Sequence, residues 1–220
     1  MVTGHGPTML DKIASYAGPI GKLAMAVAPA IASINTEVKY GDYQQTLNAW
    51  NPGTSDQIAC LTNNISQGLT DQSRIGNSIL AKDISAKFTV NYSVSPTALV
   101  SQTRIVMFVW KDNANANVPT AAKIFETPSL FLSAFNKDYT DQMVILKDKI
   151  ICHNAPISGT YAGCFSSFKV HKKLDFHMRW LDATTGNSQN HIYVLVRGLW
   201  TTSTNSSNVT LYSRMNFTDN

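Results

Sequence analysis

Charged side chains are scarce in this sequence. Asp, Glu, Lys and Arg make up 15% of the 220 residues, against roughly 25% in an average globular domain. Uncharged Ser, Thr, Asn and Gln take their place, and these side chains cost less to bury in a subunit contact than charges do. This composition suits a protein that buries much of its surface against copies of itself, and it suits a merely polar β-protein equally well.

Long apolar runs and long basic runs are also missing. No 18 consecutive apolar residues occur, which argues against a membrane-spanning helix. The net charge of +4 comes from 18 basic and 14 acidic residues, and no five like charges follow one another. The chain therefore has no basic tail and only a mild attraction to polyanions.

Cysteine is rare, and the familiar catalytic motifs are absent. Cys60, Cys152 and Cys164 are odd in number and widely spaced, so they match no zinc or disulfide pattern and are expected to be buried free thiols. The sequence contains no nucleophile elbow, zinc-protease motif, phosphate loop or dinucleotide fingerprint. We therefore predict no enzymatic activity and no cofactor.

One group of side chains could suggest a metal site. His171, Asp175 and His177 share one face of a predicted strand. At about 3.3 Å per residue these positions spread over roughly 20 Å, which is too far for one ion. We predict no metal site there.

The first 35 residues are predicted to be helical and to form an N-terminal arm. Thr8 and Asp11 have the spacing of a capping box, while Gly18-Pro19 should divide the segment and Pro29 should kink its second half. Apolar residues recur at helical spacing: Leu10, Ile13, Ala17, Ile20, Ala24, Val27, Ile31 and Ile34. This stripe is expected to pack against the domain or its neighbours, with transient membrane contact by residues 8–34, even a membrane-lytic role, as the alternatives.

From Thr36 to residue 220 the pattern changes to that of an all-β domain. Ala86, Phe88, Val90, Tyr92 and Val94 alternate with polar residues, as in a strand with one buried face. Other runs, such as 104–110, are continuously rich in β-forming, mostly apolar residues and should be buried more deeply. Eight strands are expected, at residues 36–46, 57–62, 84–95, 102–112, 142–152, 168–181, 190–200 and 208–217.

Four segments resemble a known family. They are INTEVKYGD at 34–42, ISQG with RIGNSI at 65–79, VILKDK at 144–149, and LYSRMNFTD at 211–219. In order and spacing these segments resemble the small jelly-roll coat proteins of the satellite tobacco necrosis virus type, which are shared by circular single-stranded DNA viruses and some small RNA viruses.

The resemblance implies a fold and a function. The fold is an eight-stranded jelly-roll sandwich with sheets B-I-D-G and C-H-E-F. The function is that of a viral capsid protein in the virion, with about sixty copies forming an icosahedral shell around a single-stranded DNA or RNA genome. The family often holds Ca²⁺ at subunit contacts, and Asp42, Asp148 and Asp219 lie in the matching segments, but no ligand role is assigned to them.

The family usually begins with an Arg/Lys-rich arm, whereas this arm holds only Lys12 and Lys22. Either the basic arm was removed or lies outside this sequence, or genome contact comes from elsewhere. In the last case the contact is expected on the outward faces of the B-I-D-G strands, where Tyr212 could stack a base. The alternative use of this face is subunit contact. Protonation of its histidines below about pH 6.5 would strengthen binding. The candidate residues are Lys169, His171, Lys173, His177, Arg179, Lys39, Lys87 and Arg214.

A second hypothesis of a different class is a secreted, lectin-like jelly-roll binding module with a leader cleaved near Ser33. A secreted chain could carry glycans. Five glycosylation sequons begin at Asn64, Asn91, Asn205, Asn208 and Asn216. In a chain this rich in Asn, Ser and Thr, sequons are expected by chance.

Overall fold

The computed structural model describes residues 37–49, 56–92, 100–112, 118–154, 164–181, 187–199 and 207–219. The predicted helical arm at 1–35 lies outside these residues. No helix in the described part of the chain is long and apolar enough to cross a bilayer.

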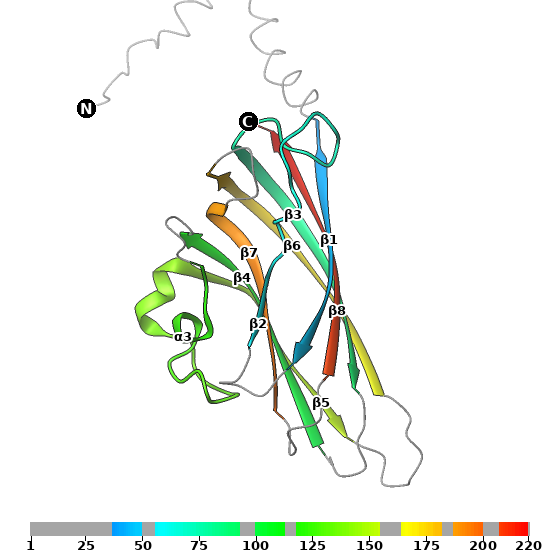
Figure 1. Ribbon diagram of the computed structural model, residues 1–220, viewed down its shortest axis with the longest axis vertical. Helices are drawn as coiled ribbons and strands as arrows, with labels where there is room; N and C mark the ends of the chain where they lie inside the picture. The colour runs from blue at the N-terminus through cyan, green and yellow to red at the C-terminus, as the bar shows by residue number, and fades with distance from the viewer. Residues whose placement is uncertain are drawn as a thin grey trace, which may run out of the picture. The chain divides into compact units, whose positions relative to one another are not determined.

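The described residues form eight β-strands and two short helices (Figure 1). The helices are α3 (Ala121–Ile124) and the 3₁₀ helix η2 (Lys137–Gln142), both between β4 and β5. The strands are β1 (Lys39–Ala49), β2 (Gln57–Cys60), β3 (Ser78–Tyr92), β4 (Val100–Asp112), β5 (Met143–Asn154), β6 (Cys164–Trp180), β7 (Asn187–Leu199) and β8 (Ser207–Asp219).

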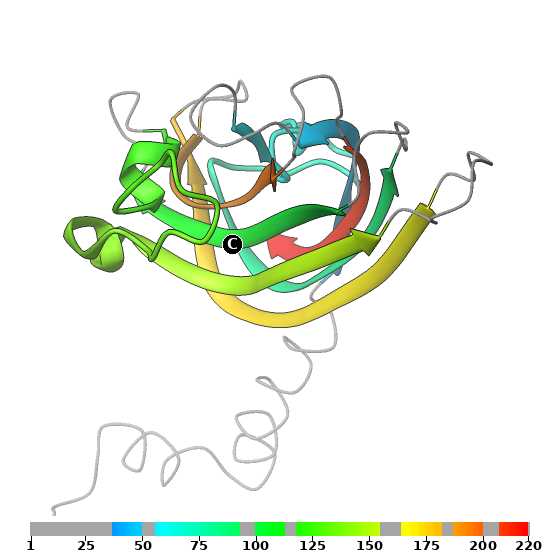
Figure 2. The same cartoon turned by 90° about the horizontal axis from the view of Figure 1, so that it is seen from below.

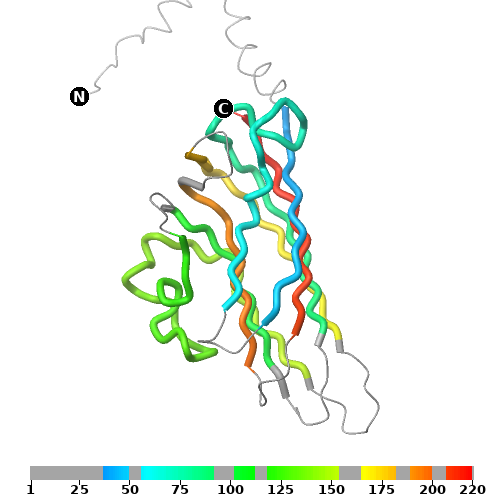
Figure 3. Tube along the Cα trace, viewed as in Figure 1, coloured from blue at the N-terminus to red at the C-terminus, as the bar shows by residue number. Residues whose placement is uncertain are grey.

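The strand order is that of a jelly roll. One four-stranded sheet runs β1-β8-β3-β6, the other runs β2-β7-β4-β5, and every pairing between these strands is antiparallel. In jelly-roll lettering these are the predicted B-I-D-G and C-H-E-F sheets. A short β6–β7 pairing, Arg179 opposite Gln189 and Trp180 opposite Asn187, joins the two sheets at one end. The predicted fold class is confirmed (Figure 3).

The inward faces of the two sheets form the main core. Phe88 of β3 and Phe168 of β6 stack with ring centroids 4.8 Å apart, and Met107 and Val194 from the opposite sheet are completely buried. On β6, Val170, Leu174, Met178 and Trp180 are buried while the residues between them are exposed or half-buried. The period of two in the sequence therefore marks the core face correctly.

The third strand begins earlier than expected, at Ser78 rather than residue 84. A β-bulge at Lys82 leaves that residue without a partner on either neighbouring strand. As a result, the buried residues Ala81 and Ile84 are three positions apart rather than two. The bulge breaks the alternation that the prediction used.

A second apolar cluster lies on the outer face of the C-H-E-F sheet. Trp110 and Tyr193 from the sheet pack there with Ile124 and Phe125 from the connection that carries α3. The strands beneath are therefore buried on both faces, as their continuous apolar runs predicted. The connection itself, residues 118–142, was not predicted to cover a sheet.

Two arginines fix this connection to the sheet. Arg104 of β4 and Arg197 of β7 are opposite each other in register, and both are buried. Their guanidinium carbons lie 4.9 and 3.9 Å from the ring centroid of Phe125, as in cation–π contacts. Arg104 binds Asp148 through two nitrogens, at 3.1 and 2.7 Å.

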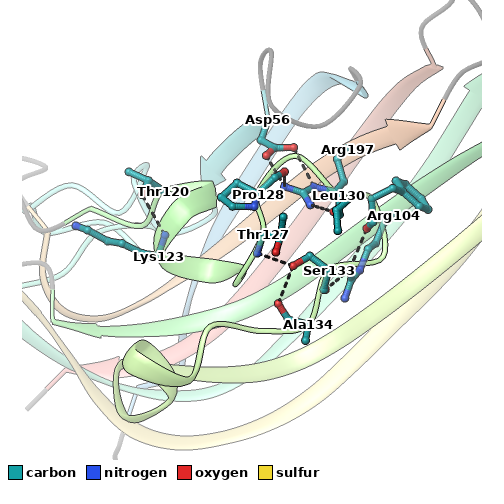
Figure 4. A network of polar contacts seen from close by, with 11 residues as sticks. Asp56, Arg104, Thr120, Lys123, Thr127, Pro128, Leu130, Ser133, Ala134 and Arg197 are labelled. Carbon is teal, nitrogen blue, oxygen red and sulfur yellow. Dashed lines mark hydrogen bonds and ion pairs between the residues drawn. The ribbon is translucent and has the colours of Figure 1, made fainter.

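Arg197 forms the more deeply buried ion pair, with Asp56, and its Nε lies 3.0 Å from Oδ1. Each arginine also donates two hydrogen bonds to main-chain carbonyls of the connection (Figure 4). These carbonyls belong to Pro128, Leu130, Phe131 and Ser133. The charges are thus satisfied within a buried network.

A buried histidine closes the end of the sandwich where β6 meets β7. His191 Nε2 lies 2.7 Å from the carbonyl of Arg179, and Nδ1 lies 2.8 Å from the Thr62 hydroxyl. Because a carbonyl only accepts, Nε2 carries the proton. Burial lowers the pKa of His191 to about 4, and the nearby positive charge of Arg74 acts in the same direction.

The cysteine prediction is partly wrong. Cys152 is exposed and Cys60 is half-buried. Even-numbered Cys152 lies on the outward face of β5, between the buried residues Ile151 and His153, so alternation places it in solvent. The side chain of Cys164 lies outside the described part of the structure.

Removing Arg197 should destabilise the fold strongly, because Arg197→Met leaves the carboxylate of Asp56 buried without its partner. We expect a loss of about 3–5 kcal/mol in the free energy of unfolding, measured by urea denaturation. The matched control is Lys137→Met, which breaks the exposed Lys137–Glu126 pair in the same connection and should cost less than about 1 kcal/mol. Equal, small losses in both variants would contradict the role of Arg197.

Acid should weaken the fold through His191. Its folded pKa lies below the ordinary value, so the neutral form stabilises the fold; this contribution is complete above about pH 6.5 and declines as the pH falls towards 4. We expect the wild type to lose up to about 3 kcal/mol more than His191→Gln between these pH values. Urea denaturation at several pH values measures this difference. His153→Gln is the comparison, since burial lowers the pKa of that group too. Identical pH profiles for wild type and His191→Gln would refute the assignment.

Candidate nucleic-acid interface

The outer face of β6 carries the predicted row of polar and basic side chains. Lys169, His171, Lys173, His177 and Arg179 are all exposed, and they alternate with core residues. No described element covers this face, in contrast to the outer face of the C-H-E-F sheet. The predicted placement of these five residues is therefore correct.

Strand register places two lysines side by side. Lys87 on β3 lies directly opposite Lys169 on β6, and on its other side it lies opposite Tyr212 on β8. Like charges directly opposite each other destabilise a sheet. This lysine pair lies on a face that no described element covers, so an anionic ligand bound there would reduce the repulsion between the two ammonium groups.

The next row along the sheet adds a histidine and an arginine. His171 Nδ1 lies 2.8 Å from the Ser85 hydroxyl. Arg214 donates to both carboxylate oxygens of Asp42 at 2.7 Å. Hydrogen bonds from Arg214 lower the pKa of Asp42, and the Asp42 carboxylate raises the pKa of Arg214. Asp42 thus offsets the charge of Arg214, and the two lysines carry most of the local positive charge.

These two rows enclose a hollow of about 390 Å³. Tyr212 is 42% exposed, so its ring is available for stacking at the edge of the hollow. Lysine ammonium groups beside an aromatic ring are what single-stranded nucleic acid binding requires: the cations contact phosphates and the ring stacks a base. The lining residues are Ser85, Ala86, Lys87, Lys169, Val170, His171, Tyr212 and Arg214.

The remaining predicted residues of β6 do not line this hollow. Lys173 lies opposite Asp83 of β3, and Arg179 lies opposite Ser78 at the far end of the strand. Ten residues separate Lys169 from Arg179, which is roughly 33 Å along a strand. Lys173, His177 and Arg179 extend the same face but form no common site with Lys87.

The predicted placement of Lys39 on this face is wrong. Its side chain is only 3% exposed, pairs with Asp219 at 2.8 Å and donates to the main-chain carbonyl of Ser73. Lys39 has the inward parity of Gly41 and Leu47 on β1, so its side chain points under the connection between β2 and β3. Lys39 is part of the fold and is unavailable to a polyanion.

The segments that resemble the coat-protein family serve the fold in this chain. Gly41 allows close packing, because a Cβ there would lie 2.7 Å from Ile65. Asp219 also accepts a hydrogen bond from the main-chain nitrogen of Ile75. The three aspartates of these segments, Asp42, Asp148 and Asp219, each pair with an arginine or lysine of the same chain.

Sequence reasoning missed Ser85, which lines the hollow, and Asp42, which pairs with the lining residue Arg214. Ser85 was visible only as a polar residue on the outward face of its strand, and Asp42 only as part of a motif. Both acquire their roles from register: β3 places Ser85 opposite His171, and β1 places Asp42 opposite Arg214. Pairing of strands far apart in the sequence gives no local signal.

Comparisons with known proteins add little. No protein-family model and no curated protein matches the chain. A structure of Desmodium yellow mottle tymovirus is 10% identical, with 82% of this chain and 87% of that chain covered and a TM-score of 0.32. A structure of infectious bursal disease virus, Gx strain, is 8% identical, with 82% and 37% covered and a TM-score of 0.23. Such low TM-scores carry no argument, so the fold assignment rests on strand order and the satellite tobacco necrosis virus type is not confirmed.

The hollow can be tested by its response to salt. We expect the double variant Lys87→Gln/Lys169→Gln to bind a poly-dT oligonucleotide more weakly and to lower the slope of log affinity against log salt by about 0.7 per lysine. Tyr212→Ala should weaken binding with little change in that slope, and Tyr212→Phe should keep the affinity. Fluorescence anisotropy at several salt concentrations measures both quantities.

The matched control is Lys123→Gln/Lys137→Gln, which removes one half-buried and one exposed lysine from the connection on the opposite sheet. If this control lowers affinity and slope as much as the double variant, binding is spread over the surface and the hollow has no special role.

Proposed function

We propose that this chain is a viral coat protein, located in the virion, whose jelly-roll copies assemble into a closed shell around a single-stranded nucleic acid. The observation that carries the proposal is the pairing of strands into B-I-D-G and C-H-E-F sheets by a chain with four coat-protein-like segments. Because one fold hosts many functions, strand order alone does not decide the matter. The second support is the basic outer face of the B-I-D-G sheet, which no element of the described residues covers.

The surface also suits self-association. Large apolar side chains are exposed at several separate places, among them Leu69, Leu132 and Phe165, at 90, 68 and 75%. Exposed apolar area of this kind becomes favourable to bury when copies of a chain pack together. We propose an icosahedral shell of about sixty copies that needs no catalytic activity.

Genome retention is assigned to the B-I-D-G face. The two lysines, the histidine and the tyrosine of the hollow would hold phosphates and bases without reading their sequence. This face does not depend on a basic arm. The chemistry is the same for DNA and RNA, and nothing in the described residues selects between them.

The test is negative-stain electron microscopy of the purified protein, with the ratio of absorbance at 260 and 280 nm measured on the same fraction. We expect uniform round particles with a nucleic-acid-like ratio. The variant Lys169→Ala/Lys173→Ala/Arg179→Ala should still form particles, with a lower ratio, because its residues lie on the outer face rather than in the core.

Two other outcomes would contradict part or all of the proposal. Particles with a protein-like ratio would retain the shell and reject genome contact through this face. A monodisperse monomer or trimer at every salt concentration and pH would reject the shell. That outcome would favour the secreted binding module, which should also lose its first thirty or so residues and carry glycans.

A further inference from the structure

A second hollow lies where the two sheets are not joined. In the described residues, β5 pairs only with β4, while β6 pairs with β3 and β7. Strands β5 and β6 run beside each other (Figure 2), and a hollow of about 350 Å³ opens between them. We call it the seam hollow. Its volume falls in the range of about 300–1,000 Å³ typical of small-molecule sites.

Apolar side chains from both sheets make up its walls. Val109 of β4 and Leu174 of β6 are buried core residues, whereas Val144 of β5 is 45% exposed at the opening. The apolar lining residues are Val109, Val144, Leu146, Leu174 and Phe176. A hydrocarbon chain placed here would remove this exposed apolar surface from water.

Two irregularities of the backbone border the seam hollow. A bulge between Met107 and Phe108 leaves Leu146 without a partner on β4, and this residue lines the hollow. Asn190, also in the lining, has a φ of 60° and donates from its side chain to the carbonyl of His177 at 2.7 Å. Bulges and left-handed non-glycine residues are concentrated at binding sites. The bulge and the left-handed Asn190 both border the seam hollow.

The polar part of the lining favours an anion. Lys111 and Lys173 both line the hollow, with Asp175 as the one acidic residue. Lys111 follows Val109 by two positions on β4, so the two side chains share the inward face of that strand. An apolar slot with an excess of positive charge at its edge is complementary to a chain that ends in a carboxylate.

We propose that the seam hollow binds a fatty-acid-like carboxylate, with its hydrocarbon chain between β5 and β6 and its head group at Lys111. The proposal concerns a site within one chain. The result of its test is therefore independent of whether the chain assembles into a shell.

The probe is dodecanoate, added below its critical micelle concentration and followed by isothermal titration calorimetry on the full-length protein. We expect saturable binding of one dodecanoate per chain, and at least tenfold weaker binding of dodecyltrimethylammonium, which has the same tail and the opposite charge. Lys111→Gln should weaken dodecanoate binding at least tenfold and leave dodecan-1-ol binding unchanged.

Val144→Trp should fill the opening and abolish binding of both dodecanoate and dodecan-1-ol. Its control is Ile150→Trp, at a residue of the same strand with similar exposure, 41%. Ile150 shares the outward face of Asp148, which pairs with Arg104, so this variant should bind as the wild type does. If Val144→Trp fails to fold, the exposed Lys111 still provides the test.

Any one of three binding results would overturn the proposal. They are the absence of saturable dodecanoate binding, binding that survives Val144→Trp, and equal affinity for the cationic analogue. A fourth result would overturn the proposal as well. If the chain forms oligomers that block dodecanoate binding, and Val144→Trp prevents those oligomers from forming, a second copy of the chain occupies the seam hollow instead.

Discussion

The layered structure depends on two arginines that project from the same side of the C-H-E-F sheet. Arg104 and Arg197 are neighbours across β4 and β7, and like charges in that position repel each other. The sheet tolerates them because Asp148 and Asp56 pair with them, Phe125 lies against both, and carbonyls of the 118–142 connection accept two hydrogen bonds from each. Without that connection the two guanidinium groups would lack their carbonyl partners on an apolar surface. Without the arginines the connection would lose the hydrogen bonds that hold it against the sheet. The two parts stabilise each other.

How far sequence reasoning reaches can be seen at single residues. Alternation placed Lys169 and His171 outward and Phe168 and Val170 inward, because side-chain direction in a strand is local information. It failed for Lys39, since a lysine was assumed to seek water, whereas Asp219 and the Ser73 carbonyl give its ammonium group buried partners. It also missed the role of the 118–142 connection. No periodicity in that segment indicates that it covers a sheet, and its partners lie on strands distant in sequence.

In the candidate nucleic-acid interface, too, the sequence predicts side-chain direction but not which residues lie together. The outward residues of each strand could be named in advance, but their grouping depends on register between β3, β6 and β8, which are widely separated in the chain. Register makes Lys87 and Lys169 a repelling pair and places Lys173 opposite Asp83. Lys169 and Lys173 look equivalent in the sequence but differ in the fold. Lys169 lies opposite a second lysine, so an anion bound there would reduce repulsion, whereas Lys173 lies opposite an aspartate.

The two sheets differ in what lies on their outer faces, and this asymmetry limits what each can do. The outer face of the C-H-E-F sheet is occupied by its own connection, with Trp110 and Phe125 fully buried. Within the described residues no element covers the outer face of the B-I-D-G sheet, which carries Lys87 and Lys169 in one row and His171 and Arg214 in the next. Shell copies of one chain would all take the same orientation, so their B-I-D-G faces would line one side of the wall. A charge pattern too weak to hold a polymer in one copy would then be repeated in every copy, and the polymer would meet all of them at once.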